Sequence, residues 1–245
     1  MDTPVSPLPP SARLAWWGTS WLRGHVGPDD LLDAVVDTDV AHRVLAVDGV
    51  TGGLVPTLAA LRREGATAVG AAFPAAGDPC GIGGPRELTD AALDAGEAVV
   101  VAEAGAALVP RRVGPTVEWT LLPASRRALV DVGEADRDLR AALLGAANRL
   151  AELDVARWRP EVADRLVDLR ERDPLTAPPG VPARCADLAA RALRAREVVD
   201  LALQDDGGAV SAAEARRRRD ALDPLDRAAR RALVAACSPE VWPPD

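Results

Sequence analysis

The glycine-rich segment of residues 77–86, GDPCGIGGPR, has the composition of a loop that could bind an anion. Gly81, Gly83 and Gly84 leave backbone N–H groups uncovered, and Arg86 follows where a helix is expected to begin. Free N–H groups at a helix start attract negative charge. The dinucleotide pattern G-x-G-x-x-G is not met, because Arg86 stands at its third glycine position. The alternative is a plain connector that needs glycine for its backbone angles.

A second glycine-rich turn, residues 48–53, contributes Asp48 and Gly49 as candidate ligand-binding residues. Like the first, it follows an expected strand and precedes an expected helix. In a parallel sheet both turns would lie at the same edge, where α/β proteins bind their ligands. The two turns together then predict a site for a small molecule or a phosphate group. The alternative is that the Asp48 side chain only caps its own turn.

Three other side chains could take part in catalysis. Cys80 precedes the expected helix, whose N-terminus could lower the pKa of the thiol, but no dedicated base is visible. His25 lies in a turn that Asp29 or Asp30 could reach, as a general base would require. His42 precedes a strand, and the two histidines do not have metal-ligand spacing. We therefore predict no catalytic residue, no metal site and no cofactor.

The residue types that are missing exclude several chemistries. All 29 basic residues are arginine, and the chain has no tyrosine, one phenylalanine and six tryptophans. Without lysine there is no Schiff base and no phosphate-loop lysine. The three cysteines lie far apart and form no CxxC pair, which favours reduced thiols in the cytoplasm. The bias toward arginine, alanine, glycine and proline is typical of a genome rich in G and C.

The net charge and the hydropathy pattern indicate whether nucleic acid or a membrane is a partner of this protein. A net charge of −8 makes a nucleic-acid partner unlikely. The strongest basic run, Arg216 to Arg219, would point all round a helix rather than form one basic face. The longest apolar stretch, residues 98–108, is interrupted by Glu103 and is too short to span a membrane. We expect a soluble cytoplasmic protein with no membrane contact.

Composition divides the chain into two halves. Residues 1–124 contain 15 acidic and 8 basic residues, a net charge of −7. Residues 125–245 contain 22 acidic and 21 basic residues, a net charge of −1. The first half is rich in glycine and valine, and the second is highly charged with helical periodicity. We predict an N-terminal α/β domain of residues 1–124 and an all-α helical bundle domain of residues 125–245.

The first half alternates between helical and strand patterns. Helices are expected at residues 12–23, from residue 28, at 54–64 and at 85–95, and strands at 43–47, 66–73, 97–102 and 116–122. A strand at residues 14–19 is the alternative to the first helix. Apolar runs without alternation suit strands covered on both faces. We predict about four mainly parallel strands with flanking helices, and an antiparallel edge strand at 116–122 paired with 107–113.

The second half predicts four or five amphipathic helices packed as an antiparallel bundle. They are expected at residues 134–155, 160–172, 183–203 and from 211 to about 237, the last interrupted at Asp223-Pro224. Trp158, flanked by Arg157 and Arg159, lies at a helix junction. These three residues are the candidate interaction site for a partner. The alternative is that Trp158 anchors the core of the bundle.

Three stretches together resemble a known group of proteins. They are residues 17–25 (WGTSWLRGH), 154–161 (DVARWRPE), and 205–211 (DDGGAVS) leading into 224–231 (PLDRAARR). The chain resembles a family of hypothetical proteins from high-GC actinobacteria, and the resemblance covers most of its length. It implies no activity and no catalytic residues.

Two classes of function follow. The leading hypothesis is a non-catalytic binding or regulatory protein that contacts a partner protein or another copy of itself through its helical half. The alternative is a small-molecule enzyme or sensor that uses Asp48 and the loop from Gly81 to Arg86. Nucleic-acid binding through Arg216–Arg219 ranks last.

Overall fold

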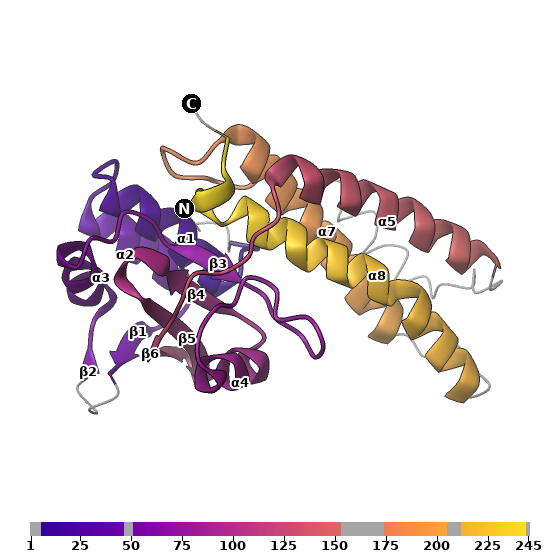
Figure 1. The fold of residues 1–245 in the computed structure, drawn as a ribbon, viewed down its shortest axis with the longest axis horizontal. Helices are drawn as coiled ribbons and strands as arrows, with labels where there is room; N and C mark the ends of the chain where they lie inside the picture. The colour runs from indigo at the N-terminus through magenta and orange to yellow at the C-terminus, as the bar shows by residue number, and fades with distance from the viewer. Residues whose placement is uncertain (1–5, 47–50, 153–173, 205–211, 244–245) are drawn as a thin grey trace.

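The computed structural model describes residues 6–46, 51–152, 174–204 and 212–243. Within these residues it has an α/β part, formed by the first half of the chain, from which the long helices α5 (Val132–Glu152), α7 (Ala183–Gln204) and α8 (Ala212–Ala236) extend (Figure 1). In the part of the chain that the structure describes, no helix is long and apolar enough to cross a membrane.

The sheet has six strands in the order β2-β1-β6-β5-β4-β3. Among the five strand pairings of the described residues, only that of β1 with β6 is parallel, so the sheet is mixed and the prediction of a mainly parallel sheet is wrong. The strands are β1 (Ala41–Leu45), β2 (Thr51–Gly52), β3 (Gly70–Ala72), β4 (Ala98–Val101), β5 (Ala106–Val113) and β6 (Thr116–Pro123).

The reason for the error is visible in β4, whose four residues are all buried. Val99 and Val101 pack against one helical layer, and Ala98 and Val100 pack against the other. The uninterrupted apolar run therefore reports burial on both faces, as predicted, but an antiparallel strand between two layers has the same pattern.

In the described part of the first half, four helices cover the two faces of the sheet. The first three, α1 (Pro10–Leu22), α2 (Pro28–Val36) and α3 (Leu54–Arg63), share a core with one face, and α4 (Arg86–Ala95) covers the other. All four agree closely with the predicted helices, and the strand alternative for residues 14–19 is excluded.

The predicted hairpin of β5 and β6 is confirmed, with Val113 opposite Thr116. Gly114, in the turn, has a φ of +58°, which glycine adopts without strain. However, β6 is not an edge strand, because β1 adds to it in parallel on the side away from β5.

The second half forms α5 (Val132–Glu152), α7 (Ala183–Gln204) and α8 (Ala212–Ala236), with a short 3₁₀ helix, η2 (Pro239–Val241), after them. The predicted break at Pro224 does not occur, since α8 continues through this residue. Pro224 and Asp220 are on the exposed side of α8, where water can satisfy the carbonyl that a proline leaves unpaired. The predicted helix at 160–172 lies outside the described residues.

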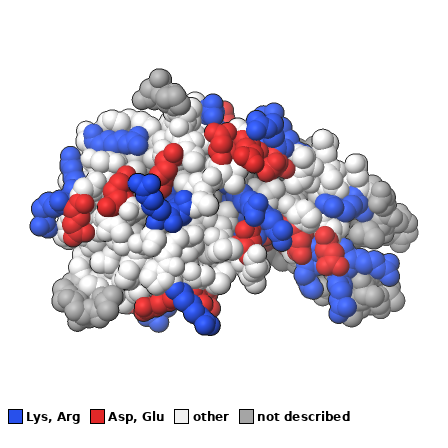
Figure 2. Space-filling view, in the orientation of Figure 1, with Lys and Arg blue, Asp and Glu red and all other residues white. Residues whose placement is uncertain are grey.

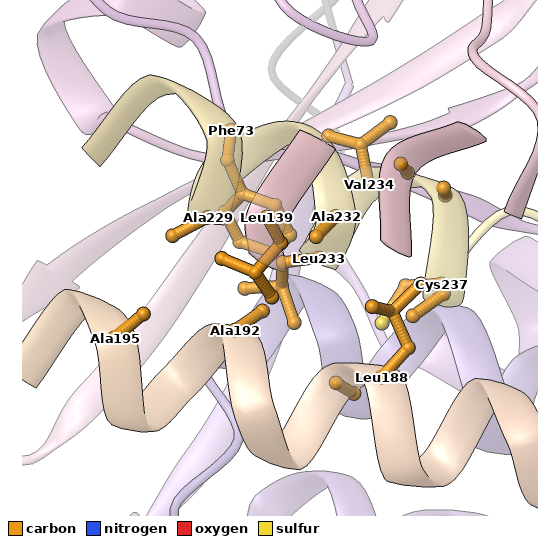
Figure 3. Packing of buried hydrophobic residues seen from close by; sticks show 14 of the residues in the cluster. Phe73, Leu139, Leu188, Ala192, Ala195, Ala229, Ala232, Leu233, Val234 and Cys237 are labelled. Carbon is orange, nitrogen blue, oxygen red and sulfur yellow. The ribbon is translucent and has the colours of Figure 1, made fainter. Parts of the chain in front are cut away.

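The long helices and the α/β part share one hydrophobic core, shown in part in Figure 3. Phe73 and Leu233 are buried in it from the two halves of the chain. The Trp16 indole N–H donates to the carbonyl of Ala236 at 3.1 Å, across a sequence separation of 220 residues. The Ala71 N–H, at the β3 edge of the sheet, donates to the Cys237 carbonyl at 2.9 Å.

Candidate functional site

The two glycine-rich turns do not leave the sheet at one edge. From β6 through β5 and β4 to β3 every pairing is antiparallel, and β1 is parallel to β6. Therefore β1 and β3 run in opposite directions, with three strands between them, and their carboxyl ends lie at opposite ends of the sheet. The expected joint site depended on a parallel sheet and is wrong. Asp48 and Gly49 themselves lie outside the described residues.

The glycines of the loop between β3 and α4 allow close contacts within the chain. The Gly81 carbonyl accepts a hydrogen bond from the Arg127 guanidinium at 3.0 Å, and the Gly83 carbonyl accepts the Ser125 N–H at 2.7 Å. A Cβ atom at Gly83 would lie 2.5 Å from the Arg126 carbonyl oxygen. The connector explanation therefore has a physical basis, and ligand binding by these glycines stays a prediction.

Gly84 and Arg86 lie in surroundings different from those of Gly81 and Gly83. Gly84 has a φ of +154°, and a Cβ atom there would lie 3.2 Å from the Ala124 Cα. The Arg86 side chain is 92% exposed at the first turn of α4, with its Nε 3.3 Å from the Asp90 carboxylate. The structure thus pairs Arg86 with its own helix, and its role toward a ligand also stays a prediction.

Cys80 does not have the lowered pKa expected of a thiol near a helix N-terminus. Burial is the larger cause and the negative charge of Asp78 is the second. Together they raise the pKa of the Cys80 thiol to about 11. Asp78 is itself buried and contacts Arg230 and Arg231 of α8 at 3.2 Å each. The loop is therefore docked on α8, and Cys80 is a thiol at neutral pH.

His25 is held at the surface by a loop rather than by a carboxylate. Its Nδ1 lies 3.3 Å from the Pro179 carbonyl oxygen, which also accepts the Ser20 hydroxyl at 2.8 Å. Asp30, one of the carboxylates expected to orient it, instead accepts the Gly27 N–H at 3.0 Å.

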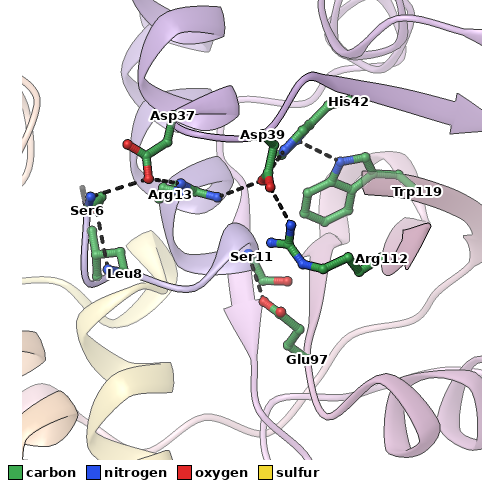
Figure 4. A network of polar contacts seen from close by, with 10 residues as sticks. All are labelled: Ser6, Leu8, Ser11, Arg13, Asp37, Asp39, His42, Glu97, Arg112 and Trp119. Atoms are coloured by element: carbon green, nitrogen blue, oxygen red, sulfur yellow. Dashed lines mark hydrogen bonds and ion pairs between the residues drawn. The ribbon is translucent and has the colours of Figure 1, made fainter. Parts of the chain in front are cut away.

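His42 is completely buried in a polar network (Figure 4). Its Nδ1 accepts the Trp119 indole N–H at 3.2 Å, and its Nε2 lies 3.0 Å from the Asp39 carboxylate. Because an indole nitrogen can only donate, the proton of the neutral imidazole is on Nε2 and is donated to Asp39. Burial lowers the pKa of His42, despite the Asp39 carboxylate, so the ring is neutral at pH 7.

Asp39 is the centre of this network. It also accepts hydrogen bonds from Arg13, at 3.4 Å, and from Arg112. Burial acts to raise the pKa of Asp39, but hydrogen bonds from Arg112 and His42 hold it below the usual value. Arg13, only 5% exposed, also contacts Asp37 at 2.6 Å. Asp37 has a φ of +52°, which is strained for a residue other than glycine.

A cleft of about 520 Å³ lies next to this network. It exists because β4 begins at Ala98 and pairs with β5 only up to Leu108, whereas β5 continues to Val113. In the described part of the chain, the last residues of β5 have β6 on one side and no strand on the other. The space is bounded by β5, the C-terminal turns of α4 and the start of α1. Its walls are mostly apolar and include Pro10, Ala91, Ala95, Val109, Pro110 and Val117.

Glu97 is the half-buried acid of the cleft. It precedes β4, and its Oε2 accepts the Ser11 N–H at 2.9 Å. This N–H belongs to the first turn of α1, which has Pro9 at its N-cap and no side-chain cap of its own. Glu97 therefore caps α1 from a distant segment. Burial raises the pKa of Glu97 even though the Ser11 N–H stabilises its charge.

Two guanidinium groups lie at the rim of the cleft, and each contacts an acid that does not line it. Arg112 is paired with Asp39, and Arg111 lies 2.9 Å from Glu118. The sequence reasoning missed the cleft, Glu97 and the arginines. The only local signal was the pair Asp37 and Asp39 shortly before His42.

The described residues on the face shown in Figure 2 give no reason to favour nucleic acid. Acidic and basic side chains alternate over the face shown in Figure 2. Within the basic run of α8, Arg216, Arg217 and Arg219 are exposed and Arg218 is half-buried. Trp158, Arg157 and Arg159, the predicted interaction residues, lie outside the described residues.

A mixed α/β part joined to long helices through a common core defines the class of this protein. The chain belongs to the Rv1486c-like protein family, whose N-terminal domain model matches residues 11–132 and whose C-terminal domain model matches residues 133–234. The resemblance to an actinobacterial family is thus confirmed.

Two relatives come from Mycobacterium tuberculosis: "Uncharacterized protein Rv1486c" of strain H37Rv and "Uncharacterized protein MT1533" of strain CDC 1551. Each is 28% identical to this chain over an alignment 291 residues long. The alignment covers 96% of this chain and 99% of the relative. No solved structure matches the chain significantly.

Proposed function

We propose that this is a non-catalytic binding protein that holds a small organic molecule in the cleft beside β5. The cleft carries the proposal. Its volume of about 520 Å³ falls within the roughly 300–1,000 Å³ of small-molecule sites. Apolar walls with a few polar groups are also typical of such sites. This proposal keeps a small molecule as the ligand, but it places the ligand in the cleft instead of at the glycine-rich turns.

The state of the reactive side chains favours binding over catalysis. Both ring nitrogens of His42 already have hydrogen-bond partners. The Cys80 thiol, with its pKa raised to about 11, is a poor nucleophile at neutral pH. Neither group lines the cleft.

Filling the cleft should abolish ligand binding. Ala95 is an exposed residue at the end of α4 that lines the cleft, so Ala95→Trp should occupy the ligand's space and leave the core intact. Ligand-observed NMR with a fragment library measures this. We expect hits with the wild-type protein that lose most of their binding to Ala95→Trp.

The matched control is Ala141→Trp, which adds the same side chain at an exposed position of α5, outside the cleft. Hits should bind this variant as they bind the wild-type protein. Fragments that bind all three proteins equally, or a library without hits, would contradict the proposal.

Contact with another protein chain through the helical half is the second candidate, and a second copy of this chain is the simplest partner. The observation that favours it is the exposure of two adjacent leucines on α5, Leu143 and Leu144, the latter 70% exposed. Light scattering after size-exclusion chromatography should detect a dimer that Leu144→Asp dissociates. A monomer at the highest soluble concentration would argue against it.

A further inference from the structure

We propose that the cleft selects an organic cation, with the ligand's ammonium group on the Glu97 carboxylate and its hydrocarbon part against the apolar walls. This inference rests on the proposed function, since it names the chemical class of the ligand that the cleft takes.

The charges that line the cleft support a positive ligand. They are two arginines, Arg111 and Arg112, and two acids, Asp94 and Glu97. Both arginines are already paired with acids that do not line the cleft. In contrast, neither Asp94 nor Glu97 has an ion-pair partner among the residues that the structure describes. The charge left without a close counter-ion in the cleft is therefore negative.

Glu97 is the stronger of the two acids as a recognition group. Asp94 is exposed, so solvent screens its charge, whereas Glu97 is half-buried and burial penalises its charge. The Ser11 N–H fixes the position of the carboxylate through Oε2, so the group is oriented before a ligand arrives. A charge pair in a poorly solvated position is stronger than the same pair in water. An ammonium group at Glu97 would thus be favoured over a neutral or anionic group.

The surroundings of Glu97 predict the pH dependence of binding. Arg196 of α7 and Arg13 of α1 lie within electrostatic reach and stabilise its charge, but burial outweighs them and its pKa is raised. Asp94 and the paired Arg111 and Arg112 line the same cleft. A cation binds only the ionised carboxylate well. Affinity should therefore increase as pH rises through the raised pKa of Glu97, and binding should release a proton below it.

Three probes that share one ring and differ in charge test the proposal: benzylammonium, benzyl alcohol and benzoate. Binding of each to the full chain is measured by titration in ligand-observed NMR at pH 7. We expect benzylammonium to bind roughly tenfold more tightly than benzyl alcohol, since a charge-assisted hydrogen bond is about twice as strong as a neutral one. Benzoate should bind most weakly.

The variant Glu97→Gln separates charge from structure. Glutamine keeps an oxygen for the Ser11 N–H, so the variant should fold, which circular dichroism checks. The variant should no longer bind benzylammonium more tightly than benzyl alcohol. Asp90→Asn, an acid of α4 that does not line the cleft, should keep the wild-type preference. Equal binding of the three probes, or a preference that survives in Glu97→Gln, would overturn the inference.

The failure of this inference can be told apart from failure of the proposed function. If benzyl alcohol or benzoate binds without any preference for benzylammonium, and Ala95→Trp blocks that binding, the cleft is a ligand site but does not select cations. If none of the probes and no fragment binds, both proposals are wrong.

Discussion

Replacing Arg127 by alanine is expected to lower the free energy of unfolding by about 3–5 kcal/mol, a cost typical of breaking a buried charged network. The Arg127 side chain is 1% exposed and donates hydrogen bonds to the carbonyls of Ala71 and Gly81, the Ser238 hydroxyl and the Glu240 carboxylate. Its removal takes this donor away from all four acceptors where the loop, β3 and the C-terminal segment meet. Urea denaturation followed by circular dichroism gives the value.

The neighbouring Arg126 provides the control. It is exposed, and Arg126→Ala should change stability by less than about 0.5 kcal/mol. Gly70→Ala should lower the stability as Arg127→Ala does, because a Cβ atom at Gly70 would collide with the Arg127 guanidinium. Equal stability of the Arg127 and Arg126 variants would refute the importance of these contacts.

The second large effect is expected at Asp39, where alanine should cost about 3 kcal/mol. The change removes the carboxylate that Arg112, Arg13 and His42 share, and leaves the Arg13 guanidinium in a nearly buried position with Asp37 alone. The Nε2–H of His42 also loses its acceptor. Chemical denaturation at pH 7 measures the change.

Asp90 is a suitable control for this variant. Its carboxylate also contacts an arginine, Arg86, but both side chains are exposed, and such a pair contributes at most about 0.5 kcal/mol. Asp90→Ala should therefore leave the denaturation midpoint nearly unchanged. A similar small effect at Asp39 would mean that the network adds little to stability.

Local patterns in the sequence were sufficient to predict most helices of the fold. The spacing of Leu14, Trp17 and Trp21 predicted α1, and glycines after α3 and α4 marked their ends. Strand direction is different, because it depends on which strands pair and not on the residues within a strand. The apolar run of β4 revealed that both its faces are buried, but it carried no information on whether its neighbours are parallel.

The candidate site could not be predicted because its contacts join distant parts of the chain. The Ser11 N–H reaches Glu97 across a separation of 86 residues, and the Trp119 indole reaches His42 across 77. Neither of these two contacts involves a sequence motif. The cleft itself results from unequal lengths of β4 and β5, which only the register between these two strands reveals.

The bond from Trp16 to the Ala236 carbonyl has a consequence for how the protein is made in the cell. At a synthesis rate of about 5–20 residues per second, Ala236, which follows Trp16 by 220 residues, emerges from the ribosome roughly 10 seconds or more after it. During that time Trp16 lacks α8, and the β3 edge lacks it as well from the moment β3 has been made. The nascent chain should therefore depend on chaperones until α8 is complete, and the last step of folding should be the docking of α8 on residues made at the start.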